Sequence, residues 1–397
     1  MLFRSRKYGN YNLEYLASFL ENNSIVSNLL YFNYFDDDAT IERALLNYDV
    51  VIFFADYLNN QKIKNICKQT KKINPIIKVI GFGKFVDKNC VNYCSNVFDF
   101  LCLGNSMQSV LNMLQNDFDP ILISNDKNVF SQNNALGKVP SRFYDASLTP
   151  KMDYYKSRNI DIKYKTYVVS TRNDVCFGQC TFCLSNKGKY LYRDGKSVVS
   201  EIKNAVSIGI RDFLINDNDF FEIWSDDKNK KRIWDIINGL SEIKEKITIS
   251  CFAKSKTILQ VDEECLQKFK DCGLYCIFIG IDAGNLIDKE IYQKGSTLSE
   301  DRLALRKMDK LGIFKRIGFI SVNPFSTPES LRENYQFLTD IKSSNIYHYG
   351  KLKTILFKGT ALYQKAFDAN LVRNERSPIA EYVFANQETA KMVRFLN

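Results

Sequence analysis

The first 115 residues alternate between apolar runs and amphipathic segments. Apolar runs that predict strands lie at 24–32, 49–55, 76–83 and 97–105. Segments with helical spacing lie at 8–20, 40–47, 61–73 and 106–115. This alternation predicts an α/β domain over residues 1–117, with a Rossmann-like (flavodoxin-like) parallel sheet. We expect Gly81, Gly83 and Gly104 just past strand ends, where such sheets bind ligands.

Residues 118–162 interrupt this rhythm. They contain three of the seven prolines, Pro120, Pro140 and Pro150. Polar stretches separate these prolines, so the segment predicts an irregular connector that includes a domain boundary.

Alternation returns from residue 163. Predicted strands lie at 164–170, 212–217, 246–253, 275–282, 315–321 and 351–357. Predicted helices lie at 198–209, 231–243, 263–273, 300–312 and 328–342. We therefore expect a partial (βα)6 barrel over 163–365 and a short tail over 366–397 with no core of its own. Gly209, Gly273 and Gly312 lie where helix C-caps are expected.

Composition narrows the functional classes. Apolar residues make up 45% of the 397 residues, which is typical of a globular protein. No run approaches the ~20 apolar residues of a membrane span, and none of signal-peptide length follows the N-terminus, so we expect a cytoplasmic protein with no membrane partner. Eleven cysteines in a reducing compartment favour metal or redox roles. The single histidine, His348, excludes histidine-rich metal sites. The net charge of +10 comes from scattered lysines, so nucleic acid is not an expected partner.

The strongest chemical motif directly follows the first predicted barrel strand. Cys176, Cys180 and Cys183 form a C-x3-C-x2-C pattern, in which one loop can fold three thiolates around a common centre. An iron–sulfur cluster would keep one iron open to another ligand, whereas zinc would need a fourth ligand from elsewhere. Zinc sites usually combine two C-x2-C pairs, or one such pair with a pair of histidines. Neither combination appears here, so the pattern favours the cluster.

This motif, with Phe182 as its aromatic residue, resembles that of the radical S-adenosylmethionine (SAM) superfamily. Further segments resemble this family in order: FLINDNDF (213–220), FIGIDAGN (278–285), KGST (294–297), RIGFISVNPFSTPESL (316–331) and FKGTALY (357–363). The resemblance covers about 165–365. It implies a [4Fe-4S] cluster held by the three cysteines as catalytic ligands, and reductive cleavage of SAM to activate an unreactive C–H bond. It also implies a reducing partner such as flavodoxin or ferredoxin.

The resemblance implies SAM contacts beyond the cysteines and Phe182. Asn216, Asp217 and Asn218 would hold the methionine ammonium, Lys254 the methionine carboxylate, and Asp282 a ribose hydroxyl. Each has an alternative interpretation: a solvated turn for the first three, a surface lysine for Lys254 and a helix N-cap for Asp282. Their predicted positions at strand carboxyl ends favour the ligand roles.

Residues 1–115 resemble the cobalamin-binding domain that precedes many such barrels. The D-x-H-x-x-G motif is absent and the segment contains no histidine, so an imidazole axial ligand from this domain is excluded. Gly81, Gly83 and Gly104 are the candidate cobalamin contacts. The resemblance implies cobalamin-dependent methylation of a small molecule or peptide. Three alternatives stay open: a cobalamin-independent rearrangement or cyclisation, an iron–sulfur sensor or scaffold, and a zinc-stabilised nucleic-acid-binding module.

Overall fold

The computed structural model divides the chain into two compact units, residues 1–165 and 166–397. The structure describes residues 11–28, 38–54, 60–82, 98–102, 107–119, 129–130, 166–172, 175–185, 190–343, 346–350, 352–373 and 379–396. Each unit is described separately below.

The first unit is built around a four-stranded sheet with strand order β1-β2-β3-β4. Its strands are β1 (Val50–Phe54), β2 (Lys78–Phe82), β3 (Phe100–Cys102) and β4 (Val129–Phe130), and its helices are α1 (Tyr11–Asn22), α2 (Asp38–Leu45), α3 (Asn60–Ile73) and α5 (Met107–Gln115). The first three strands are parallel, and β4, from the predicted connector, pairs antiparallel with β3. The strand predicted at 24–32 is wrong over 24–28, where the chain follows a turn at Ser24; its remainder lies outside the described residues.

The core of the first unit lies between this sheet and its helices. Ile80 and Phe82 of β2 are fully buried and pack against α1 and α5. Gly81 lies inside β2, not past its end as predicted. A Cβ on Gly81 would come within 2.8 Å of both Leu101 and Phe98, so the missing side chain allows close packing on β3. Gly83 and Gly104 lie outside the described residues.

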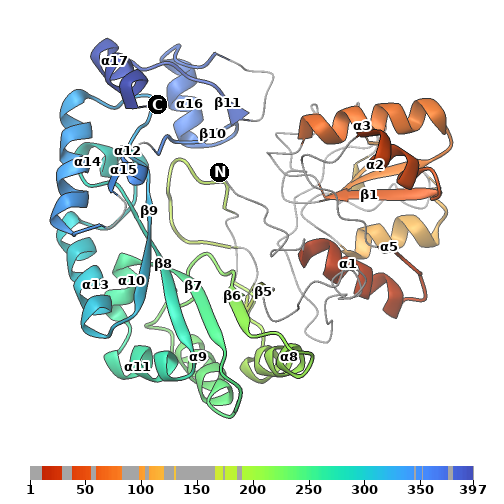
Figure 1. The fold of residues 1–397 in the computed structure, drawn as a ribbon, viewed down its shortest axis with the longest axis horizontal. Helices are drawn as coiled ribbons and strands as arrows, with labels where there is room; N and C mark the ends of the chain where they lie inside the picture. The colour runs from red at the N-terminus through yellow and green to blue at the C-terminus, as the bar shows by residue number, and fades with distance from the viewer. Residues whose placement is uncertain are drawn as a thin grey trace. The chain divides into compact units, whose positions relative to one another are not determined.

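The second unit contains a five-stranded parallel sheet with strand order β5-β6-β7-β8-β9. Its strands are β5 (Thr166–Val169), β6 (Asp212–Ile215), β7 (Thr248–Lys254), β8 (Leu274–Asp282) and β9 (Phe314–Phe319). The helices between them are α8 (Gly195–Ser207), α9 (Asp227–Leu240), α10 (Ser255–Gln260), α11 (Glu263–Asp271), α12 (Leu286–Tyr292) and α13 (Leu298–Lys310). These helices line the outer side of a curved sheet (Figure 1). The arrangement is that of an open βα barrel.

The sixth predicted strand is much shorter than expected. A parallel bridge joins Val322 to Lys353, and the chain then forms β10 (Leu356–Phe357), which pairs antiparallel with β11 (Ile379–Ala380). The remaining helices are α14 (Pro328–Asp340), α15 (Ile346–Tyr349), α16 (Ala361–Asp368) and α17 (Gln387–Leu396). Leu371 and Ala380, from the segment predicted as a tail, join a core cluster with Ala283 and Tyr292.

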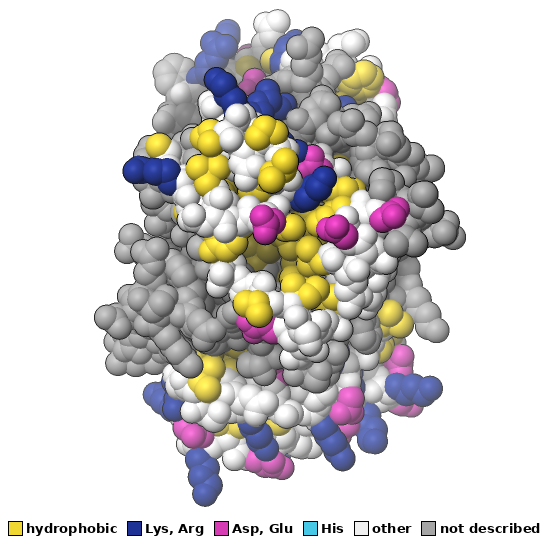
Figure 2. Space-filling view, turned by 90° about the vertical axis from the view of Figure 1, so that its right-hand side faces the viewer, with side chains coloured by type: hydrophobic (Ala, Val, Ile, Leu, Met, Phe, Trp, Pro, Cys, Tyr) yellow, Lys and Arg dark blue, Asp and Glu magenta, His cyan; other side chains and the backbone are white. Residues whose placement is uncertain are grey.

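The described helices are too short or too polar to cross a bilayer. On the face shown in Figure 2, the coloured Lys and Arg side chains are interspersed with Asp and Glu side chains.

Candidate active site

The cysteine motif lies in the loop that follows β5, at the carboxyl edge of the parallel sheet. Cys176 is buried, Cys180 is partly buried and Cys183 is exposed. Thr181 anchors the loop: its N–H donates to the Tyr292 carbonyl at 3.0 Å, its hydroxyl to the Ile291 carbonyl at 2.6 Å, and its carbonyl accepts from the Leu362 N–H at 2.8 Å. The end of α12 and the start of α16 thus hold the centre of the cysteine loop.

Two of the three sulfurs receive backbone hydrogen bonds. The Gly178 N–H donates to Cys176 Sγ at 3.3 Å, and the Ser185 N–H donates to Cys183 Sγ at 3.4 Å. Such donors stabilise thiolates and tune iron–sulfur clusters. Burial raises the pKa of Cys180; Lys294 opposes this rise, whereas Asp282 and the other two thiols add to it. The three thiols therefore share one electrostatic environment.

Within the part of the chain that the structure describes, no three His, Cys, Asp or Glu side chains converge where a single metal ion could bind. The donor set fits an iron–sulfur cluster, because three thiols come from one loop and backbone N–H groups support two of them.

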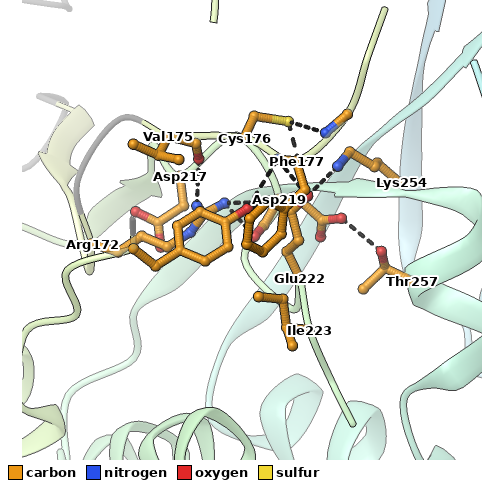
Figure 3. Close-up of polar contacts among 12 residues, drawn as sticks. Arg172, Val175, Cys176, Phe177, Asp217, Asp219, Glu222, Ile223, Lys254 and Thr257 are labelled. Carbon is orange, nitrogen blue, oxygen red and sulfur yellow. Dashed lines mark hydrogen bonds and ion pairs between the residues drawn. The ribbon is translucent and has the colours of Figure 1, made fainter. Parts of the chain in front are cut away.

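A buried carboxylate, Glu222, lies directly beneath this loop (Figure 3). It accepts hydrogen bonds from Arg172 Nη2 at 3.1 Å and from the Phe177 N–H at 3.3 Å, and it pairs with Lys254. The Tyr190 hydroxyl also donates to it. Burial works to raise the pKa of Glu222, but these partners, with Lys254 foremost, lower it overall. Glu222 is therefore an ionised hub beside the first cysteine.

Sequence reasoning missed this hub. Arg172 lies four residues before the first cysteine, and Glu222 lies two residues beyond the FLINDNDF segment. Their charges resemble those of ordinary loop residues. A hydrophobic signal was present, because a fully buried Phe220–Phe221 pair directly precedes Glu222. That pair shows that the loop after β6 turns inward and carries the carboxylate with it.

Lys254 ends β7 and lies beside the cysteine loop. A Cβ on Gly178 would lie 3.3 Å from Cys176 Sγ and 3.4 Å from Lys254 Nζ, so both groups border the same point. The side chain of Lys254 keeps 22% of its exposure, while that of Glu222 keeps 8%. Lys254 is thus a half-buried ammonium group at the carboxyl edge of the sheet, held by Glu222.

The predicted Asn216–Asn218 segment follows β6 at the same edge. Asp217 is buried, and its carboxylate accepts from the Thr171 N–H at 2.9 Å and from the Thr171 hydroxyl. Asn216 donates its N–H to the Val169 carbonyl at 2.8 Å, and the side chains of Asn216 and Asn218 are half-buried. Asp217 therefore ties the ends of β5 and β6 together, while the two asparagines border the edge.

Asp219 completes the loop after β6. It is fully buried; one carboxylate oxygen accepts from the Thr257 hydroxyl at 2.7 Å, and the other has no hydrogen-bond partner among the described residues. Burial raises the pKa of Asp219 to about 6.

Asp282 ends β8, with a left-handed backbone (φ +65°). It pairs with Lys294, and both side chains are about nine-tenths buried. The N-cap of α12 is Asn285, so the alternative role of Asp282 as an N-cap is not realised. A Cβ on Gly280 would lie 2.8 Å from Lys294 Nζ, so this glycine provides the space in which the lysine reaches Asp282.

Phe182 packs edge-on against Tyr292, with ring centroids 5.3 Å apart. The Tyr292 hydroxyl accepts from Asn323 Nδ2 at 3.0 Å, and Asn323 also donates to Asp288 at 2.7 Å. Phe182 thus connects the cysteine loop to a buried polar network between β8 and β9.

The chain resembles known proteins in sequence and in fold. No protein-family model matches the chain. It is 27% identical over 180 residues to 4'-phospho-dehydrooxetanocin synthase from Priestia megaterium, a match that covers 41% of this chain and 24% of that protein. The chain therefore spans about a quarter of this curated relative.

Two solved structures share most of the fold. The cobalamin-dependent SAM radical enzyme OxsB, with aqua-cobalamin and SAM bound, aligns over 98% of this chain and 63% of its own, with a TM-score of 0.77 and 16% identity. The radical SAM methyltransferase TsrM from Kitasatospora setae, with cobalamin and a [4Fe-4S] cluster bound, aligns over 84% of this chain and 71% of its own, with a TM-score of 0.66 and 15% identity.

The predicted fold, a Rossmann-like domain followed by a radical SAM barrel, is thus confirmed, as is the predicted resemblance to radical SAM enzymes. The cofactors that we predicted, a [4Fe-4S] cluster, SAM and cobalamin, are those named for these structures.

Proposed function

We propose that this chain is a cytoplasmic radical SAM enzyme that uses cobalamin to methylate an unactivated carbon of a small molecule or peptide. The observation that carries the proposal is the placement of Cys176, Cys180 and Cys183 at the carboxyl edge of the parallel sheet. Lys254 and Asp282 end two strands at the same edge. Active sites of βα barrels lie at this edge.

Different residues would bind the cluster and the methionine part of SAM. The cysteines would bind the cluster, and Lys254, oriented by Glu222, would bind the methionine carboxylate. Asn216 and Asn218 would contact the methionine ammonium, with Asp217 shaping their loop through Thr171. When bound, the cluster supplies the electron that cleaves SAM and so yields a radical able to abstract hydrogen.

Asp282 would accept a hydrogen bond from a ribose hydroxyl, and its ion pair with Lys294 would orient its carboxylate at the end of β8. Phe182, braced by Tyr292, would support the cysteine loop beside the adenosine. These roles use charges that are already paired and oriented in the structure, as an effective binding site requires.

Cobalamin use is supported by the likeness to OxsB, which covers 98% of this chain, and to TsrM, which covers 84% of it. In this proposal the first unit would present cobalamin, and a flavodoxin or ferredoxin would supply the electrons.

The test is SAM cleavage by the anaerobically reconstituted full chain with dithionite, measured as 5'-deoxyadenosine. Cys180→Ala should abolish product formation, whereas Cys272→Ala, a substitution away from the loop, should preserve it. Equal activity of the Cys180→Ala variant would overturn the assignment. A cluster without SAM cleavage would favour the sensor or scaffold alternative. Cleavage without cobalamin binding would favour a cobalamin-independent rearrangement or cyclisation.

A further inference from the structure

The barrel strands carry a second chemical feature on the face turned away from the helices, here called the inner face. Along β7, Ile249, Cys251 and Ala253 are buried, while the residues between them are only partly covered. Since strand side chains alternate between faces, Phe252 and Lys254 belong to the inner face. The strand register adds Phe278 and Gly280 of β8, and then Arg316 and Gly318 of β9.

Aromatic rings line this face below the cofactor edge. The rings of Phe252 and Phe278 lie 5.3 Å apart. Towards the start of the strands, a register shift between β7 and β8 leaves Tyr275 as an extra residue, and its ring stacks on Phe314 at 5.5 Å. These two residues remain 57% and 53% exposed. Exposed aromatic side chains that gather on one concave surface are typical of ligand sites.

Two glycines leave room for neighbouring side chains on this face. Gly280 and Gly318 are register partners on neighbouring strands. A Cβ on Gly318 would come within 2.8 Å of the Phe278 ring. The Phe278 ring therefore lies over Gly318, and Lys294 lies over Gly280 in the row that contains Lys254.

Arg316 is the cation of this face that lacks a counter-charge. Its guanidinium lies 5.9 Å from the centre of the Phe278 ring, and the residue is exposed. It forms no ion pair or side-chain hydrogen bond with any residue that the structure describes. By contrast, Lys254 pairs with Glu222. Asp212, a carboxylate on the same sheet, accepts a hydrogen bond from the Thr248 hydroxyl at 3.0 Å rather than from Arg316.

We propose that Arg316 binds the anionic group of the substrate, a carboxylate or phosphate, while Phe252 and Phe278 contact an attached apolar or aromatic body. This inference rests on the proposed function, because it places the substrate in the barrel. The planar guanidinium matches both anions through paired N–H donors. Arg316 lies two residues along its strand from Gly318, a step of roughly 7 Å. The anionic group would thus bind deeper than the cofactor edge.

The experiment is calorimetric titration of the full chain, without cofactors, with phenyl phosphate, benzoate and phenol. Phenyl phosphate and benzoate should bind more tightly than phenol, and the tighter of the two identifies the preferred anion. Arg316→Met should weaken that binding by about ten- to a hundred-fold, the usual range for a charge-assisted contact. The affinity of Arg316→Lys should lie between those of the wild type and Arg316→Met. Arg306→Met, which removes an exposed arginine from the outer helix α13, should bind like the wild type.

Unchanged affinity in Arg316→Met, or no anion binding by the wild type, would overturn the inference. The second result would mean that Arg316 is already paired within the full chain. SAM cleavage by the wild-type chain separates this failure from a failure of the proposed function. If the wild type forms 5'-deoxyadenosine but Arg316→Met keeps the wild-type affinity for the anion, only the inference about Arg316 is overturned.

Discussion

Replacing Glu222 with glutamine tests the buried hub beneath the cysteine loop. The change keeps the volume and removes the charge, so Arg172 and Lys254 lose their shared counter-ion. Loss of one partner from a buried ion pair costs about 3–5 kcal/mol. The lower end applies here, because Arg172 keeps the Val175 and Asp219 carbonyls at 2.6 and 3.0 Å, and Lys254 retains contact with water.

A loss of about 3 kcal/mol should lower the melting temperature of the second unit by roughly 6–12 °C, at about 2–4 °C per kcal/mol for a unit of this size. Circular dichroism of the full chain without cofactors measures it. Glu242→Gln is the matched control, because Glu242 pairs with Lys203 on the surface and should leave the melting temperature unchanged. Equal melting temperatures for the two variants would refute the assignment of Glu222 as a structural hub.

Three further predictions concern Asp219, Lys294 and Gly239. Burial raises the pKa of Asp219 to about 6, so between pH 4 and 6 the folded state keeps a proton that the unfolded state loses, and stability falls as pH rises. The Asp219→Asn variant should show a weaker dependence of the melting temperature on pH between pH 4 and 6. The same dependence as in the wild type would contradict this. Lys294→Met should lower the free energy of unfolding by about 3 kcal/mol in a denaturant titration, because it leaves Asp282 buried without its partner. The double variant with Asp282→Asn should recover part of this loss. Strictly additive effects of the two substitutions would exclude the pairing. Gly239→Ala would place a Cβ 2.6 Å from Val199 Cγ2, so it should cost about 1–3 kcal/mol by calorimetry, and Val199→Ala should relieve it; no relief would exclude the clash.

Local pattern predicted the elements of the barrel well, because each strand is buried along one face and bounded by clear breakers. Gly209, Gly273 and Gly312 have positive φ values after α8, α11 and α13, as their predicted C-cap positions require. The pairing of β10 with β11 could not be predicted, because it joins segments more than twenty residues apart that are each only two residues long. Short strands carry almost no periodic signal.

The candidate site could be predicted only in part. The cysteine spacing is local and identified the loop without tertiary information. The partners of Lys254 and Asp217 depend on contacts across strands, which no single segment encodes. Asp217 accepts a hydrogen bond from the Thr171 N–H, which follows β5. Lys254 pairs with Glu222, which is 32 residues away in the sequence. Paired charges of this kind become visible only when burial is known.

The central claim is that Cys176, Cys180 and Cys183 hold a [4Fe-4S] cluster in a cobalamin-dependent enzyme. The most direct measurement is iron and cobalamin content, with the absorbance spectrum, after anaerobic reconstitution of the full chain with iron, sulfide and hydroxocobalamin and subsequent desalting. The account predicts about four irons and one cobalamin per chain, and loss of the iron in the triple Cys→Ala variant with cobalamin retained. Wild-type iron content in the triple variant would contradict the claim.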